Sequence, residues 1–353
     1  MSSSQINHVG VYYGPDDIRV EAREIPRIRE DEALVATSST ALCAGEAMPW
    51  YHKDPHGKVL GHEVIGTIAQ VGSHVSEFHV GDRIFAHHHV PRLISHQALR
   101  GHFTIDPHYR ETHFNPGAMA DYFVIGPRQI HGDTFIIPET ISDDEAVTIE
   151  PWSCVVSGLK VSGIQPGDTV LVIGAGFMGL GFAAIAPLFG AGRVIVSDLN
   201  PWRRQKALEI GANAVIDPRR EDAAEQLRSL NEGLLADVVV AAVPNVEVFR
   251  EARRLVEPGG TIHLAAPGHP NTQWSQDAAE TYFSEVTITS RYSSDHTDVY
   301  QYLRWLKAGR VNPNPAITHH FPLSRLAEAF RLLSTADRSL KIVLRPDHLY
   351  EGA

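Results

Sequence analysis

The chain has 353 residues, enough for two domains, and its hydrophobic fraction of 43% and charged fraction of 21% are ordinary for a globular protein. Its net charge of −11 argues against nucleic acid or an anionic membrane as a main partner. The sequence shows neither a secretory signal nor an apolar run long enough to span a bilayer, so we expect a cytoplasmic protein. Two cysteines cannot form a disulfide framework, whereas 20 histidines call for a test of metal-binding spacing.

The amino-terminal part of the chain consists of short apolar segments separated by glycine- and proline-containing loops. No long helical period appears there, which is typical of an antiparallel, barrel-like domain. The predicted strands are residues 10–13, 32–37, 64–69 and 82–86.

From about Pro151 onward, strands alternate with helices, as expected of a doubly wound parallel sheet. We expect the tail to return and complete the first domain, so that residues 1–153 and 294–353 form one domain and residues 154–293 the other. The predicted strands are residues 169–173, 193–197, 237–241, 261–265, 286–289 and 340–344, and the predicted helices are 201–210, 246–256 and 299–308.

A glycine-rich turn, Gly174-Ala175-Gly176-Phe177-Met178-Gly179, directly follows the apolar strand of residues 169–173 and precedes helix-forming residues. The first glycine permits the tight turn, the second lets the backbone approach a pyrophosphate, and the third packs helix on strand. The phosphates then lie at a helix N-terminus, where free N–H groups favour negative charge. The turn in this position predicts a dinucleotide site.

A second strand, residues 193–197, ends in Asp198, about 20 residues beyond the turn, where a ribose-binding acid belongs. A carboxylate there accepts hydrogen bonds from a ribose 2′-hydroxyl and repels a 2′-phosphate, so we expect NAD rather than NADP. The alternative is an α/β domain whose glycine-tight turn binds no nucleotide.

Four potential metal ligands precede the nucleotide domain: Cys43, His62, Glu63 and Glu150. Thiolate, imidazole and carboxylate suit Zn²⁺, and a catalytic zinc needs three protein ligands plus an open position. Each residue alone favours ordinary packing. Their coincidence with a mid-chain dinucleotide fold favours a metal site.

Over nearly the whole chain, Cys43, Gly61-His62-Glu63, Glu150-Pro151 and the glycine-rich turn resemble the zinc-dependent medium-chain dehydrogenases of the alcohol dehydrogenase superfamily. The resemblance is nearest to the sorbitol (polyol) and threonine dehydrogenase branch. It implies an α/β protein with a GroES-like antiparallel β-barrel catalytic domain and a Rossmann NAD-binding domain. It also implies a homodimer or homotetramer, because family members pair edge strands of their nucleotide domains.

The resemblance further implies that Cys43, His62 and Glu63 bind zinc, with Glu150 as a fourth ligand or a hydrogen-bond partner of the zinc-bound water. Glu46 falls where the family has an acid that orients the zinc-binding histidine. The implied reaction is hydride transfer between NAD and a secondary alcohol (a polyol, sugar or cyclitol), with zinc as a Lewis acid.

Arg291 and Tyr292 match a pair that lines the substrate cleft in sorbitol dehydrogenases, and Thr112 lines it on weaker alignment. The equally weighted alternative for Arg291 and Tyr292 is a solvent-facing pair at a strand end. Beyond the glycines and Asp198, the residues expected to contact the cofactor are Phe177, Met178, Arg203 and Val243.

The chain departs from relatives that bind a second, structural zinc through four cysteines in a lobe after a Val-Pro. Here those positions are Arg92, Ser95, Ala98 and Asp106, so we predict one catalytic zinc and no structural zinc. An ion pair of Arg92 with Asp106 is expected to take the metal's place, at under about 1 kcal/mol. The spacing of the lobe's histidines matches no common metal site. His87-His88-His89 is predicted to be solvated surface or cleft lining rather than a metal site.

A second departure concerns proton transfer. Two residues past Cys43, relatives usually carry a Ser or Thr whose hydroxyl relays the alcohol proton, but this chain has Gly45. The proton must then use Glu150, an ordered water, or a nearby group such as His52 or Tyr51. The missing hydroxyl keeps one alternative function open, the reduction of a conjugated or imine-like bond. A separate alternative is a non-catalytic nucleotide-binding protein descended from such enzymes, against which the intact metal ligands and Asp198 argue.

Overall fold

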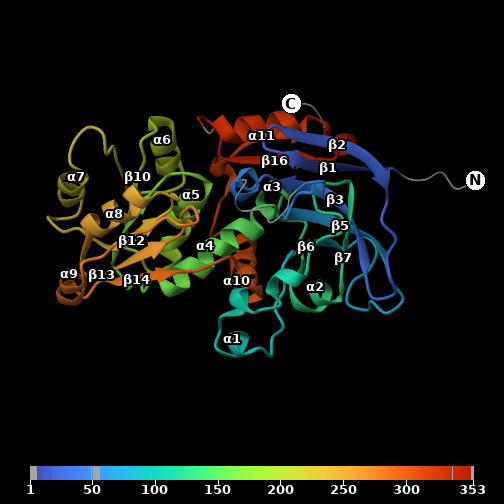
Figure 1. Cartoon of the computed structure of the whole chain (residues 1–353), viewed down its shortest axis with the longest axis horizontal. Helices are drawn as coiled ribbons and strands as arrows, with labels where there is room; N and C mark the ends of the chain where they lie inside the picture. The colour runs from blue at the N-terminus through green and yellow to red at the C-terminus, as the bar shows by residue number, and fades with distance from the viewer. Residues whose placement is uncertain (1–5, 49, 51–55, 336, 351–353) are drawn as a thin grey trace, which may run out of the picture. The chain divides into compact units, whose positions relative to one another are not determined.

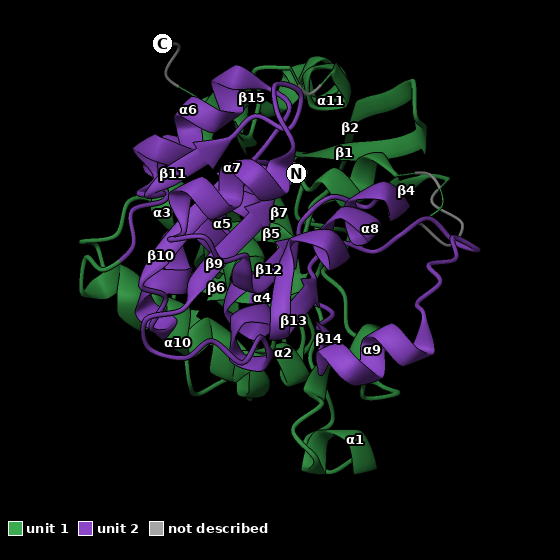
Figure 2. Cartoon of the chain, turned by 90° about the vertical axis from the view of Figure 1, so that its left-hand side faces the viewer, with its two compact units in different colours: residues 1–153, 294–310, 317–353 green, residues 154–293, 311–316 purple. Residues whose placement is uncertain are grey.

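The computed structural model describes residues 6–48, 50, 56–335 and 337–350 (Figure 1). The chain divides into two compact units (Figure 2). Unit 1 comprises residues 1–153, 294–310 and 317–353, and unit 2 comprises residues 154–293 and 311–316. Residues 311–316 thus group with unit 2, whereas the predicted boundaries place them in the first domain. Within the described part of the chain, every helix is too short or too polar to cross a membrane.

Unit 1 contains two sheets. The smaller one has the order β2–β1–β4, with β1 (Ile6–Gly14), β2 (Asp17–Glu24) and β4 (Lys58–Val59) paired antiparallel. The larger one has the order β15–β16–β3–β5–β6–β8, and β7 also pairs with β3. Its strands are β3 (Ala33–Ala41), β5 (Glu63–Val71), β6 (Arg83–Ala86), β7 (Tyr122–Ile125), β8 (Thr134–Ile136), β15 (Ile317–Pro322) and β16 (Lys341–Arg345). Only β15 and β16 pair in parallel in this sheet.

The predicted antiparallel first domain is confirmed, and the tail does return to it, because β16 pairs with β3. β3 is a central strand of small and β-branched residues, flanked along its length by β5, β7 and β16. Its pairing with β5 sets Ala41 opposite Glu63. The end of β3 and the start of β5 therefore meet at one place.

Helix α4 (Ile149–Val161) carries Glu150 in its first turn. The start of α4 is fixed by Tyr302 of α10 (His296–Lys307), whose hydroxyl lies 2.9 Å from Oγ1 of Thr148. The Tyr302 ring also contacts Trp152 edge-on, with centroids 6.2 Å apart. Both rings are fully buried. Helix α4 begins in unit 1 and continues into unit 2 from Cys154 onward. Besides α10, the described helices of unit 1 are α1 (His96–Leu99), α2 (Pro127–Gly132), α3 (Asp143–Ala146) and α11 (Leu326–Thr335), with 3-10 turns η1 (Ala44–Ala47), η2 (Phe103–Ile105), η3 (Tyr109–Glu111), η6 (Leu323–Arg325) and η7 (Asp347–Leu349).

Unit 2 is a six-stranded parallel sheet with the order β11–β10–β9–β12–β13–β14. This order is that of the doubly wound dinucleotide-binding fold, in which the first strand lies between the two halves. Its strands are β9 (Thr169–Ile173), β10 (Arg193–Ser197), β11 (Ala214–Ile216), β12 (Ala236–Ala241), β13 (Val256–Leu264) and β14 (Thr287–Ser290). Its helices are α5 (Phe177–Ile185), α6 (Pro201–Glu209), α7 (Ala223–Leu230), α8 (Val246–Leu255) and α9 (Ala278–Ser284), with 3-10 turns η4 (Ala186–Phe189) and η5 (Asn314–Ala316).

β13 begins five residues earlier than the sequence predicts. Pro258-Gly259-Gly260 is typical of a strand entry, yet it lies inside the strand. The register explains the difference, because β12 and β13 pair at Ala236 with Val256 and again at Val238 with Thr261. The Pro-Gly-Gly segment thus forms an irregularity within the ladder rather than a break before it.

His263 of β13 is 1% exposed, and burial lowers its pKa to about 4. An unfolded chain has a histidine pKa of about 6.5, so it binds a proton before the folded protein does. Stability is therefore lost as the pH falls from 6.5 toward 4. We expect the free energy of unfolding of the wild type to fall by about 1.4 kcal/mol more per pH unit in this window than that of His263→Gln. Urea unfolding at several pH values measures both slopes, and parallel slopes would contradict the prediction.

Candidate metal centre and nucleotide site

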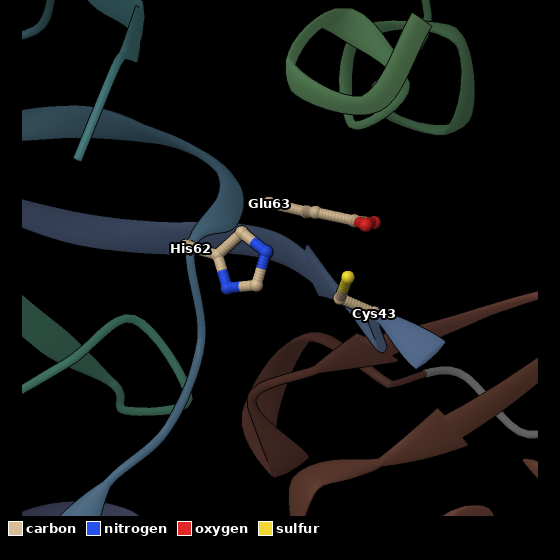
Figure 3. A group of neighbouring side chains, drawn as sticks. All are labelled: Cys43, His62 and Glu63. Atoms are coloured by element: carbon tan, nitrogen blue, oxygen red, sulfur yellow. The ribbon is translucent and has the colours of Figure 1, made fainter. Parts of the chain in front are cut away.

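Three of the predicted zinc ligands converge in unit 1. The ligand atoms of Cys43, His62 and Glu63 all lie within 4.8 Å of one another. Figure 3 shows the sulfur atom and the carboxylate on the same side of the His62 ring. Cys43 follows β3 and Glu63 begins β5, so the β3–β5 register builds the cluster. Gly61 is required just before it, because its φ is +100° and a Cβ there would lie 2.3 Å from the Met119 nitrogen.

Glu46, in η1, contacts two residues of this cluster, Cys43 and His62, and also Gly61. Its carboxylate accepts the Gly61 N–H at 2.8 Å and the Cys43 N–H at 3.3 Å, and lies 3.2 Å from Nδ1 of His62. A carboxylate at Nδ1 orients an imidazole and leaves Nε2 for a metal. Burial alone would lower the pKa of His62, but the charges of Glu46 and Cys43 outweigh it and raise this pKa well above its usual value.

Lys341 is a residue of the cluster that sequence reasoning missed. Its Nζ lies 2.5 Å from Oε2 of Glu63 and donates to the Leu42 carbonyl at 3.0 Å. The Lys341 and Glu63 side chains are 4% and 2% exposed, so this ion pair is buried. The one local signal was a lysine within an apolar strand, since residues 340–344 read Leu-Lys-Ile-Val-Leu. Glu63 thus faces Cys43 and His62 while a cation neutralises its charge.

Glu150 belongs to a second group, with His87 and His88, whose ligand atoms also all lie within 4.8 Å of one another. Of the two placements predicted for His87-His88-His89, solvated surface is wrong, because His87 is 0% and His89 is 8% exposed, and cleft lining stays a prediction. The chain leaves β6 inward, where the His87 N–H donates to the Asp133 carbonyl at 2.9 Å. Burial lowers the pKa of His87 to about 4 and that of His89 to about 3, so both are neutral at pH 7.

Asp133, beside this second group, is a buried acid whose carboxylate has no hydrogen-bond partner among the described residues. Burial and the negative charges of Asp295, Asp298 and Glu150 raise its pKa well above its ordinary value. The neighbourhood of His87 and Glu150 is therefore rich in acidic groups.

In the lobe that follows Val90-Pro91, the observed ion pairing differs from the predicted one. The Arg92 guanidinium lies 3.6 Å from Glu111, while the Asp106 carboxylate accepts the His108 N–H at 2.7 Å. Asp106 is buried, so the expected exposed pair with Arg92 is replaced by a backbone contact. Across the described residues, the groups of three or more ligand side chains are Cys43/His62/Glu63 and His87/His88/Glu150.

The other predicted substrate-site residues lie outside the two groups of potential metal ligands. Thr112 accepts the Val90 N–H at its hydroxyl, at 2.8 Å, and the His89 ring contacts its carbonyl, also at 2.8 Å. Arg291 and Tyr292 follow β14 in unit 2 and are half-buried, and their substrate-binding role stays a prediction. Tyr51 and His52, named as proton-transfer groups, lie outside the described residues.

The glycine-rich turn of unit 2 has the shape that a pyrophosphate needs. Gly174 has a φ of +105°, and a Cβ on Gly179 would lie 1.8 Å from the Gly174 carbonyl oxygen, so helix α5 packs directly on the turn. Gly176 is the N-cap of α5, and a Cβ built on it would meet no atom within 4 Å. The free space lies at the helix N-terminus, where an anion is favoured. Phe177 and Met178 begin the helix at this point.

Asp198 lies at the end of β10, beside that turn. Its carboxylate accepts the N–H groups of Ala175 and Asn200, each at 2.7 Å. Two oxygens accept more than two hydrogen bonds, so the carboxylate retains capacity for a ribose hydroxyl. Val243 follows β12 and closes over the turn, because its side chain lies 2.5 Å from where a Gly174 Cβ would stand. Arg203 lies in the first turn of α6.

Comparison with known proteins places this geometry in a family. Residues 29–134 match the family described as alcohol dehydrogenase GroES-like domain, and residues 178–308 match the zinc-binding dehydrogenase family. A sorbitol dehydrogenase of Bacillus subtilis (strain 168) is 29% identical over 358 residues, which cover 96% of each chain.

Solved structures share the fold. A putative zinc-binding dehydrogenase from Sinorhizobium meliloti 1021, bound to NADP, has a TM-score of 0.87 at 23% identity and covers 97% of this chain and 100% of its own. A protein from Escherichia coli CFT073 described as a short chain alcohol dehydrogenase, complexed with NADH, has a TM-score of 0.86 at 24% identity and covers 97% of this chain and 100% of its own. With both domain families matched and a full-length sorbitol dehydrogenase relative, the chain belongs to the zinc-dependent medium-chain dehydrogenases, in their polyol branch.

Proposed function

We propose that the protein is a zinc- and NAD-dependent dehydrogenase that oxidises a secondary alcohol of a polyol, sugar or cyclitol. The observation that carries the proposal is the convergence of Cys43, His62 and Glu63 within 4.8 Å. Thiolate, imidazole and carboxylate are the donor set that zinc takes, and three ligands leave one position open. The full-length similarity to a sorbitol dehydrogenase supports the polyol class.

In this proposal, Cys43, His62 and Glu63 would hold the ion, which when bound supplies Lewis acidity to an alcohol oxygen. Glu46 keeps the His62 ring oriented through Nδ1. Lys341 offsets the charge of Glu63, so that the buried cluster does not carry an excess of negative charge. The turn at Gly176 and the carboxylate of Asp198 would bind the pyrophosphate and the adenosine ribose of NAD.

The test is a screen of polyols, sugar acids and cyclitols with NAD, followed by the appearance of NADH. We expect turnover with at least one of them, loss of it on chelation, and recovery with Zn²⁺. Inactive protein that nonetheless contains zinc would contradict the substrate class. Because Gly45 offers no relay hydroxyl, NADH oxidation with enals and imines is measured in parallel, and activity there alone would favour the reductase alternative.

We expect Asp198→Ala to weaken NAD binding and to reduce the preference over NADP. Loss of a charge-assisted hydrogen bond costs about 1.5–3 kcal/mol, or roughly a 10- to 150-fold rise in KM for NAD. The NADP constant should change less, because the repulsive charge is removed as well. Asp198→Asn is the control for the turn, since its side-chain oxygen still accepts a backbone N–H. An unchanged ratio of the two constants would remove Asp198 from cofactor selection.

A further inference from the structure

Helix α9 of unit 2 presents an aromatic surface to solvent. None of its seven residues is buried, and the side chains of Tyr282 and Phe283 are 76% and 81% exposed. The two rings contact each other edge-on, with centroids 5.2 Å apart, so they form one continuous apolar surface. Exposed apolar surface of this kind marks an interaction site, and aromatic residues are enriched where two protein surfaces bury each other.

The chain around this aromatic surface is acidic. Residues 271–290 contain Asp277, Glu280 and Glu285 and no Lys, Arg or His. Glu280 lies 3.0 Å from Arg253, which offsets its charge. Glu285, the C-cap of α9, is exposed and has no ion-pair partner within the described parts of the chain. A partner of α9 therefore needs apolar side chains accompanied by positive charge.

The lobe that follows Val90-Pro91 has this character. Residues 92–110 contain three arginines and one acid, Asp106, which is buried. Arg100 is exposed, and the described residues include no ion-pair partner for it. Helix α1 forms the tip of the lobe, away from the sheets of unit 1 (Figures 1 and 2). The exposed aliphatic side chains of the lobe are Leu93 at 50%, Ile94 at 84%, Leu99 at 74% and Ile105 at 57% exposure.

The lobe is fixed to the rest of unit 1. The Glu111 carboxylate lies 3.6 Å from Arg92, 3.3 Å from Arg128 of α2 and 2.7 Å from Nδ1 of His108. The buried Tyr109 hydroxyl donates to the Ser294 carbonyl at 2.8 Å. A surface held in this way binds a partner without first having to become ordered, which lowers the entropic cost of association.

We propose that the lobe of one copy of this chain binds α9 of a second copy. Aliphatic side chains of the lobe would cover Tyr282 and Phe283, and the arginines of the lobe would face the acids around α9. The occupant is a second copy because each copy supplies both surfaces, whereas two lobes or two α9 surfaces would set like charges against each other. This contact differs from the edge-strand pairing that the family resemblance implies, and it does not depend on the proposed reaction.

The experiment is sedimentation velocity of the full-length protein over a concentration series. We expect the wild type to associate, and Ile94→Asp/Leu99→Asp and Phe283→Asp each to raise the dissociation constant by at least about 30-fold. Added salt should weaken association of the wild type, because the two surfaces carry opposite charge. Val80→Asp and Leu234→Asp are the controls, since these side chains are 64% and 56% exposed and lie outside both surfaces.

Mixing the two variants tests the pairing itself. The Phe283→Asp chain keeps an intact lobe, and the Ile94→Asp/Leu99→Asp chain keeps an intact α9, so one unaltered lobe–α9 contact forms between them. We expect the mixture to associate more tightly than either variant does alone. A mixture that associates no more tightly than the separate variants would overturn the proposal.

Three other results would also overturn it: a monomeric wild type, two variants that both associate like the wild type, and weakening by only one of the two. A photo-crosslinker that replaces Phe283, in a mixture of isotope-labelled and unlabelled chains, gives a test that does not depend on the aspartate variants folding. The crosslinked peptides should come from residues 92–110 of the other copy, and crosslinks confined to any other region would contradict the contact.

Discussion

Cys43→Ser is expected to remove the zinc of the first cluster and turnover together. A serine oxygen is a far weaker zinc ligand than a thiolate, and the cluster has only two other ligands, His62 and Glu63. A metal Lewis acid contributes several kcal/mol of transition-state stabilisation, so kcat/KM should fall by at least about 1000-fold. Elemental analysis and steady-state kinetics on the same preparation measure both quantities.

Cys154→Ser is the matched control, because Cys154 is the only other cysteine of the chain and is half-buried like Cys43. It should retain both zinc and turnover. Turnover that persists in Cys43→Ser without zinc would require a metal-free mechanism.

Lys341→Met is expected to cause the largest loss of stability. The substitution keeps the length of the side chain but leaves Glu63 buried without its cation. Removing one partner of a buried ion pair costs about 3–5 kcal/mol, because the remaining charge is uncompensated. Urea unfolding of metal-depleted protein, followed by circular dichroism, measures the change.

Two variants locate the cause of that loss. Glu63→Gln/Lys341→Met removes both charges and should recover part of the lost stability. Arg325→Met removes a cation from an exposed pair with Glu328 and should cost less than about 1 kcal/mol. If Lys341→Met unfolds like the Arg325 variant, the buried pair does not carry the stability assigned to it.

The strands predicted from apolar runs are present within a few residues, since those runs lie in the interior of both units. β9, buried at every residue, is the clearest case. β2 (Asp17–Glu24) was missed because it is an edge strand, paired among the described residues with β1, and five of its eight side chains are charged. Polar edge strands lack the apolar pattern by which a strand is recognised.

The site likewise contains residues that a local sequence pattern predicts and residues that it does not. Cys43, His62 and Glu63 were predicted from a local motif, and the pairing of β3 with β5 brings them together. The roles of Lys341 and of the histidine triplet depend on pairings that no local pattern encodes. Lys341 reaches Glu63 only because β16 returns to β3, and His87 is buried only because the chain turns inward after β6.

The partner of Glu63 lies 278 residues further along the chain. A ribosome adding about 5–20 residues per second delivers Cys43, His62 and Glu63 many seconds before Lys341. Throughout that interval Glu63 lacks Lys341, and β3 lacks β16. The metal centre is therefore complete only after β16 has been synthesised, and a chain truncated before Lys341 would carry all three ligands without the cation that pairs with Glu63.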